Sequence, residues 1–152
     1  MSGEMNREEQ VNKILAGLEL PPGVIIRPWG EADFPATQTL VIAEGWRTLE
    51  QRPAAGLKAW QNSWPTLVAA SNGEVIGILR AITDYEVTTY IAEILVDPQW
   101  RGRGIGKLLL EVCHRLVPET RFDLLSLERS VGFYSANGFR EFRGFRKSDF
   151  TG

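Results

Sequence analysis

The segment from Arg101 to Lys107, RGRGIGK, has the residue types and the spacing needed to bind an anion. Its glycines alternate with basic or apolar side chains, and it lies between the apolar runs YIAEILVDP and LLLEVCHRL. A helix start presents unpaired backbone N–H groups, and glycines let the oxygen atoms of a ligand reach those groups. The segment therefore predicts a phosphate-binding loop at the start of a helix.

The spacing of the glycines excludes the two best-known phosphate loops. A Walker A loop has four residues between its glycines and then Lys-Ser or Lys-Thr, whereas Gly102 and Gly106 enclose Arg103, Gly104 and Ile105, and Leu108 follows the lysine. A dinucleotide-binding fingerprint requires G-x-G-x-x-G, whereas the glycines here are evenly spaced. The loop therefore belongs to a phosphate-binding pattern of another kind.

The loop does satisfy the pattern [Q/R]-x-x-G-x-[G/A], through Arg101, Gly104 and Gly106. Downstream, GFYSANGF at 132–139 places Tyr134 on a short predicted helix that precedes a Gly-Phe pair. With these two motifs in this order, residues 23–148 resemble the GNAT superfamily of acyl-CoA-dependent N-acyltransferases.

The resemblance implies a site for coenzyme A. Backbone N–H groups of the loop would bind the pyrophosphate, and the pantetheine arm would lie between the preceding strand and the segment 123–127. An N–H of Leu95 or Val96 would polarise the thioester carbonyl. Many members carry an asparagine where this chain has Leu127, so Ser126 or Ser130 would have to substitute. The expected donor-binding residues are Ile94, Leu95, Val96, Arg101, Gly102, Arg103, Gly104, Ile105, Gly106 and Lys107.

Acyl transfer also needs an acid and a base. The resemblance assigns the acid to Tyr134, although a half-buried structural tyrosine is the alternative. Strand alternation places Glu93 on the same face as Ile91 and Leu95, where apolar neighbours would make it a stronger base. An ion-paired or solvent-facing carboxylate, or a water chain as the base, is the alternative. Secondary candidates for the base are Glu44, Asp84 and Glu86.

Three tryptophans, Trp46, Trp60 and Trp64, fall in the region where the family builds its acceptor site. They could form an aromatic wall for an amine, or they could be packed in the core. Cys113 and His114 are neighbours on a predicted helix and point about 100° apart, which argues against a catalytic pair. Both residues are expected to be structural.

Hydrophobic periodicity predicts an α/β fold. The fold class is a single-domain, mixed and mostly antiparallel sheet with helices on both faces and an N-terminal helix. The resemblance adds that the central strands are splayed and that residues 23–152 are the acetyltransferase domain, with 1–22 as an N-terminal extension. The expected helices cover 6–19, 53–60, 105–116 and 128–137, and residues 31–46 are expected to form a turn that leads into a helix capped near Asp33 or Phe34. The expected strands cover 24–29, 66–70, 75–83, 88–96, 121–127 and 139–147, the last with a bulge at Gly144.

Composition narrows the class of protein. The 152 residues carry 17 basic and 19 acidic side chains, a net charge of −2, which argues against a nucleic-acid partner. No apolar run approaches the roughly 20 residues of a membrane helix. The single cysteine excludes an internal disulfide and favours the cytoplasm, and no metal site is expected.

The function that the resemblance implies is transfer of an acetyl group from acetyl-CoA to a primary amine, by direct attack in a ternary complex, with CoA as product. The acceptor would be a small molecule or a peptide, and a homodimer is the default assembly. Two alternatives stay open. One is a CoA-binding sensor of the same fold without catalysis, and the other is an enzyme that binds a nucleotide in the loop.

Overall fold

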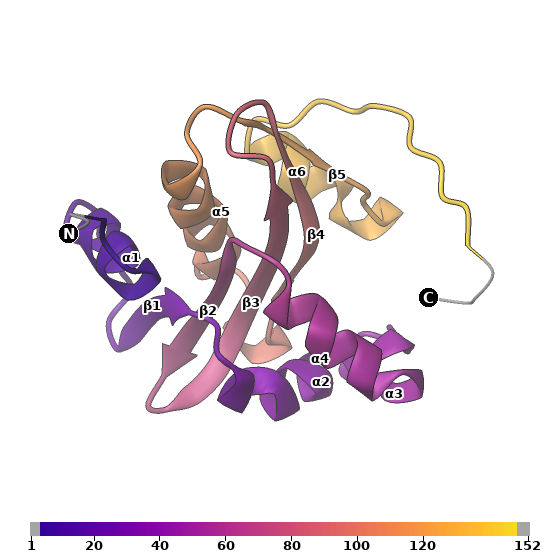
Figure 1. Ribbon diagram of the computed structural model, residues 1–152, viewed down its shortest axis with the longest axis horizontal. Coiled ribbons are helices and arrows are strands. Elements are labelled where there is room, and N and C mark those ends of the chain that lie inside the picture. Colours follow the sequence, from indigo (N-terminus) through magenta and orange to yellow (C-terminus); the bar gives the residue numbers. More distant parts are fainter. Residues whose placement is uncertain (1–3, 149–152) are drawn as a thin grey trace.

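A computed structural model describes residues 4–148, which contain one five-stranded sheet whose strands lie in chain order (Figure 1). Strands β1 (Val24–Pro28), β2 (Thr66–Ser71), β3 (Glu74–Thr83) and β4 (Thr88–Val96) are antiparallel. The last strand, β5 (Arg121–Leu124), pairs in parallel with β4. The mixed, mostly antiparallel sheet is confirmed.

Two tight turns hold the antiparallel strands in register. Asn72 and Gly73 join β2 to β3 with φ values of 51° and 79°, the left-handed conformations that a two-residue hairpin requires. In the β3–β4 turn, Asp84 accepts the backbone N–H groups of Glu86, Val87 and Thr88, and these hydrogen bonds lower the pKa of its carboxyl. Asp84 therefore stabilises a turn, and the base role considered for it is not supported.

Helices cover both faces of the sheet, as the sequence predicts. One face packs against α1 (Arg7–Leu15) and α5 (Ile105–Leu116), with Val11 and Leu109 fully buried between them. The other face packs against α2 (Phe34–Ala43), α3 (Thr48–Gln51) and α4 (Pro53–Gln61). A short helix, α6 (Val131–Ala136), follows β5, and single 3-10 turns cover Glu31–Asp33 (η1), Pro98–Trp100 (η2) and Glu128–Ser130 (η3). The four-residue α3 is not anticipated by the sequence.

The N-terminal helix α1 belongs to the core of this chain. Asn6 and Glu9 form the predicted capping box, in which Glu9 N–H donates to Asn6 Oδ1 at 2.8 Å and Asn6 N–H donates to the Glu9 carboxylate at 3.3 Å. Its apolar face contacts β1 and α5. The helix thus packs on its own sheet.

A β-bulge interrupts the alternation that the sequence predicts along β4. Arg80 pairs with Glu93 but Ala81 pairs with Ile91, so Ala92 is an extra residue without a partner on β3. Because of this extra residue, odd-numbered side chains before Ala92 face one side of the sheet, and odd-numbered side chains after it face the other. Ile91 lies in the α1/α5 face, whereas Leu95 lies in the α2–α4 face. The prediction that both flank Glu93 on one face is wrong for Ile91.

The predicted last strand at 139–147, with its bulge at Gly144, does not form. Among the described residues, 139–148 contain no strand, and Figure 1 shows this segment arching away from the sheet in yellow. Phe142 and Phe145 are 76% and 90% exposed. Phenylalanine and arginine each recur at every third position here. A strand would therefore place apolar and charged side chains on both faces, so that neither face could be buried. The predicted strand at 121–127 also ends early, at Leu124.

Candidate active site

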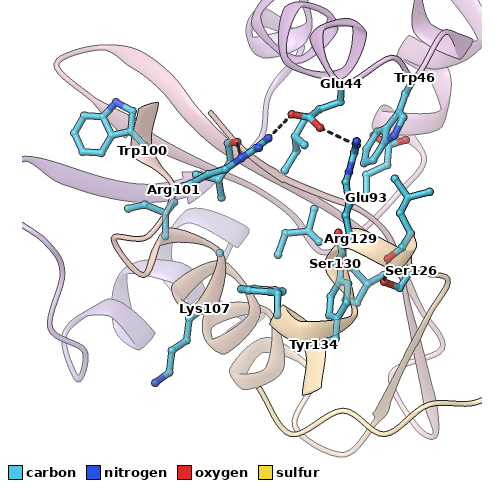
Figure 2. Close-up of a pocket in the computed structure, with 18 of the residues that line it drawn as sticks. Glu44, Trp46, Glu93, Trp100, Arg101, Lys107, Ser126, Arg129, Ser130 and Tyr134 are labelled. Carbon is cyan, nitrogen blue, oxygen red and sulfur yellow. Dashed lines mark hydrogen bonds and ion pairs between the residues drawn. The ribbon is translucent and has the colours of Figure 1, made fainter. Parts of the chain in front are cut away.

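The strands β4 and β5 diverge after a short paired stretch, and a pocket opens between them. Their ladder covers Thr88–Ile91 and Arg121–Leu124, and β4 then continues to Val96 beyond the end of β5. The pocket has a volume of about 600 Å³ and is bounded by the loop before α5 and by α6 (Figure 2). Its lining residues are Glu44, Trp46, Ile91–Val96, Trp100–Gly102, Gly104–Lys107, Leu125–Leu127, Arg129, Ser130, Phe133 and Tyr134.

The register of β4 decides which of its backbone groups face the pocket. Asp97 N–H donates to Ile76 C=O on β3 at 2.8 Å, and hydrogen-bonded pairs alternate along an antiparallel ladder. Leu95 is therefore turned toward β3, whereas the N–H and C=O groups of Ile94 and Val96 face the gap. Of the two residues expected to polarise a carbonyl, the geometry favours Val96.

The loop before α5 presents backbone donors at one end of the gap. Gly102 and Gly104 have φ values of 78° and 82°, which residues other than glycine rarely adopt. Leu108 N–H makes the first intrahelical bond, to Gly104 C=O at 3.0 Å, so the N–H groups of 105–107 precede the helical ladder. The N-cap residue, Gly104, has no side chain with which to cap this helix start. The site therefore fits an anionic ligand bound by backbone groups.

The basic side chains of the loop have different roles. Arg101 donates from Nε to Val96 C=O at 3.1 Å and from its terminal nitrogen to Glu44. Arg103 lies over the ring of Trp100 at 4.6 Å and does not line the pocket. Lys107 is exposed at the rim. Every predicted donor-binding residue except Arg103 thus lines the pocket.

Tyr134 on α6 lines the pocket from the side opposite Glu44 (Figure 2). Its ring makes edge contacts with Phe133 and Phe139, at centroid distances of 5.2 and 5.4 Å. Burial raises the pKa of its phenol, so the hydroxyl stays protonated at neutral pH. The group can therefore donate a proton inside the pocket. Ser126 and Ser130 line the same side, where the resemblance implies an asparagine.

Glu93 also lines the pocket, but as half of an ion pair. Arg80, directly opposite on β3, donates to its Oε1 at 3.2 Å, and the two side chains are only 15% and 17% exposed. Arg80 donates further to Ser63 Oγ. Glu93 Oε2 has no hydrogen-bond partner among the described residues. The structure thus shows Glu93 as an ion-paired carboxylate, one of the alternatives that the sequence left open.

The tryptophans do not form the predicted wall. Trp46 lines the pocket, next to Glu44. Trp60 is 1% exposed and packs against Trp29 with ring centroids 5.3 Å apart. Trp64 belongs to the opposite core face, and Arg7 covers its ring. Trp60 and Trp64 are therefore core residues, because α4 and the short segment between α4 and β2 place both indoles against the sheet.

Glu44 is the functional candidate that sequence reasoning undervalued. It ends α2, and its carboxylate binds Arg101 and Arg129, which lie 57 and 85 residues further along the chain. Figure 2 shows the carboxylate between the two guanidinium groups. Local spacing carries no signal for contacts at such separations, so only the fold brings these residues together.

Comparison with known proteins assigns the class to which this fold and site belong. Residues 62–141 match the family model of the acetyltransferase (GNAT) domain, which covers more than half of the chain. The chain belongs to the GNAT family of acetyltransferases. Among residues 4–148, no helix is both long and apolar enough to cross a membrane.

Particular relatives agree with this assignment. The chain is 34% identical over 87 residues to the chloroplastic GCN5-related N-acetyltransferase 3 of Arabidopsis thaliana, an alignment that covers 55% of this chain and 36% of that protein. It spans between 27% and 55% of the length of that protein and three other plant relatives.

Solved structures share the fold at lower identity. A GNAT-family acetyltransferase of Streptococcus pneumoniae superposes with a TM-score of 0.69 at 20% identity, over 83% of this chain and 96% of the other. An N-acetyltransferase of Thermoplasma acidophilum, solved in complex with coenzyme A, superposes with a TM-score of 0.61 at 18% identity, over 77% and 89%.

Proposed function

We propose that this protein transfers an acetyl group from acetyl-CoA to the primary amine of a small molecule or a peptide, by direct attack in a ternary complex. One observation carries the proposal. The gap between β4 and β5 leads without interruption from the uncapped start of α5 to the protonated hydroxyl group of Tyr134. The complex of the Thermoplasma relative with coenzyme A supports the identity of the donor.

The donor side is built from backbone. N–H groups of the loop 101–107 and the positive end of α5 bind the pyrophosphate. The gap-facing groups of Ile94 and Val96 bind the pantetheine arm as an added strand would. This arrangement delivers the thioester, whose carbonyl carbon is the electrophile, into the gap beside β4.

The transfer needs two proton movements. The amine nitrogen attacks the thioester carbon while Val96 N–H stabilises the developing oxyanion. The amine loses a proton to Glu93, directly or through a water chain, and the C–S bond breaks. Tyr134 donates its proton to the departing thiolate, and a phenol suits this role because the two groups have comparable basicity. Trp46 lies at the acceptor end.

A binding measurement followed by an activity screen tests the proposal. Acetyl-CoA at about 100 times its dissociation constant should stabilise the folded protein by roughly 2.7 kcal/mol and raise its melting temperature. ATP is the matched control because it lacks the pantetheine arm. No shift with millimolar acetyl-CoA contradicts the proposal, and an equal shift with ATP indicates a nucleotide site.

The screen then offers amines, amino acids, polyamines, aminoglycosides and peptide N-termini, and follows the release of free thiol. Release with at least one class is the expected result. Stabilisation by acetyl-CoA without thiol release for any amine would instead identify the CoA-binding sensor.

Three further parts of the proposal concern the whole protein. Residues 23–152 form the acetyltransferase domain, and 1–22 are an N-terminal extension whose helix α1 packs on that domain. The protein forms a homodimer, which light scattering at micromolar concentration tests. Its compartment is the cytoplasm, and fractionation of cells that express the tagged full-length protein tests that localisation.

A further inference from the structure

A single carboxylate connects the donor loop to the segment that carries Tyr134. Arg101 is the first residue of the loop, and Arg129 lies in the 3-10 turn η3, immediately before α6. Each donates to a different oxygen of Glu44, and the Arg129 contact measures 3.0 Å. Figure 2 shows both guanidinium groups directed at Glu44 from opposite sides. Three segments distant in the sequence therefore meet at one residue.

The burial of Glu44 makes this link stronger than two surface ion pairs. Its side chain is only 12% exposed, while those of Arg101 and Arg129 are 50% and 61% exposed. Exposed pairs contribute little because solvent screens them. A carboxylate shielded from solvent interacts more strongly with both partners, and each partner gives it one charge-assisted hydrogen bond. Arg101 is held a second time, at Val96 C=O.

The segment on the other side of the link has little else to hold it. Neither η3 nor α6 contributes a fully buried residue, and α6 has only six residues. The contacts that hold α6 are the close approach of Phe133 to Gly106 and the ring contact of Tyr134 with Phe139. The ion pair to Arg129 is therefore a main constraint on where Tyr134 lies relative to β4.

We infer that Glu44 is a positioning residue, which holds the helix of the general acid in register with the donor loop through Arg129 and Arg101. This inference rests on the proposed function. Glu44 need not touch either substrate, because its effect passes through Tyr134. A loss of alignment of about 1 Å at a reacting group can lower turnover by as much as about a hundredfold.

A double-mutant cycle on turnover tests the inference. Glu44→Gln keeps the size of the side chain and removes its charge. It should lower kcat by about tenfold in the wild-type background and by less than about twofold in the Tyr134→Phe background, since residues that act through one another are not additive. Additive losses in the double variant would overturn the inference.

Two further variants guard against a loss that is only structural. Arg129→Gln alters an exposed side chain and should lower kcat while leaving the dissociation constant of acetyl-CoA unchanged. Glu44→Asp keeps the charge and should retain part of the activity. Glu50→Gln, which breaks the exposed Arg47–Glu50 pair, is the matched control and should leave kcat unchanged in both backgrounds. Equal losses of kcat in Glu44→Asp and Glu44→Gln would contradict a role for the charge.

The two proposals fail in different ways. If the wild-type protein binds acetyl-CoA but acetylates no amine in the screen, the proposed function is wrong, and the positioning role falls with it. If the wild-type protein is active and Glu44→Gln is as active as the control variant, only the positioning role is wrong.

Discussion

Arg80 on β3 donates to the carboxylate of Glu93 on β4 at 3.2 Å, and Glu93 lines the pocket. The bulge at Ala92 creates the arrangement, because it turns Glu93 to the α2–α4 face beside Leu95. The carboxylate that Glu93 contributes to the pocket is therefore balanced by a cation from the neighbouring strand.

The Arg80–Glu93 pair gives the first prediction. Glu93→Gln and Arg80→Gln should each lower the free energy of unfolding by about 2 kcal/mol, because each leaves the charge of its partner uncompensated. The loss is somewhat smaller than for a fully buried pair, since both side chains are partly exposed. Urea unfolding measures the loss. If Glu93 also accepts the amine proton, Glu93→Gln should lower kcat well beyond Arg80→Gln at matched stability. Equal kcat in the two variants would assign the base to the water chain.

The second prediction concerns Tyr134. Tyr134→Phe should lower kcat by about a hundredfold and leave the dissociation constant of acetyl-CoA unchanged, because it removes only the proton donor. Full activity in this variant would remove the tyrosine from the acid role.

The pH dependence follows from the environment of the same residue. Burial raises the pKa of the phenol above its ordinary value of 10.0, so Tyr134 should stay protonated throughout the neutral range. The loss of rate caused by its ionisation should occur only above pH about 10. Above that pH the unfolded chain loses this proton first, so stability should decrease as pH rises. An alkaline limb near pH 8 that vanishes in Tyr134→Phe would contradict this assignment.

The third prediction separates the tryptophan of the pocket from a tryptophan of the core. Trp60→Phe should lower the free energy of unfolding by about 1–2 kcal/mol, because it leaves a cavity beside Trp29. Trp46→Phe should change stability by less than about 0.5 kcal/mol and should raise KM for the amine. Chemical denaturation and steady-state kinetics measure the two effects. A large loss of stability in Trp46→Phe would move that residue into the core.

The fourth prediction concerns Cys113, which is fully buried. Burial raises the pKa of its thiol from 9.0 to about 12, so little thiolate exists at neutral pH. A disulfide reagent that labels thiols should react with the folded protein far more slowly than with the urea-unfolded chain. Above pH about 9 the unfolded chain ionises first, and stability should decrease as pH rises toward 12. Rapid labelling of the folded protein would contradict the burial.

Local features of the fold could be predicted because neighbouring residues determine them. The Asn6–Glu9 capping box and the Asn72-Gly73 hairpin depend on side chains and dihedral angles within four residues. The bulge at Ala92 could not, because it depends on how β3 and β4 align. The strand predicted at 139–147 does not form, because a single bulge at Gly144 still leaves Phe139 and Phe142 on opposite faces of a strand.

The loop of the proposed donor site can be found from the chain alone. The spacing of Gly102 and Gly104 predicts their left-handed backbone, and the proposed ligand-binding groups there are backbone N–H groups, so a local pattern is sufficient to find them. The rest of the pocket depends on the tertiary structure. The pairing of Glu93 with Arg80, the burial of Trp60 and the meeting of Glu44 with Arg129 join residues that are distant in the chain. Side-chain contacts between such residues depend on strand register and helix packing, which no local pattern records.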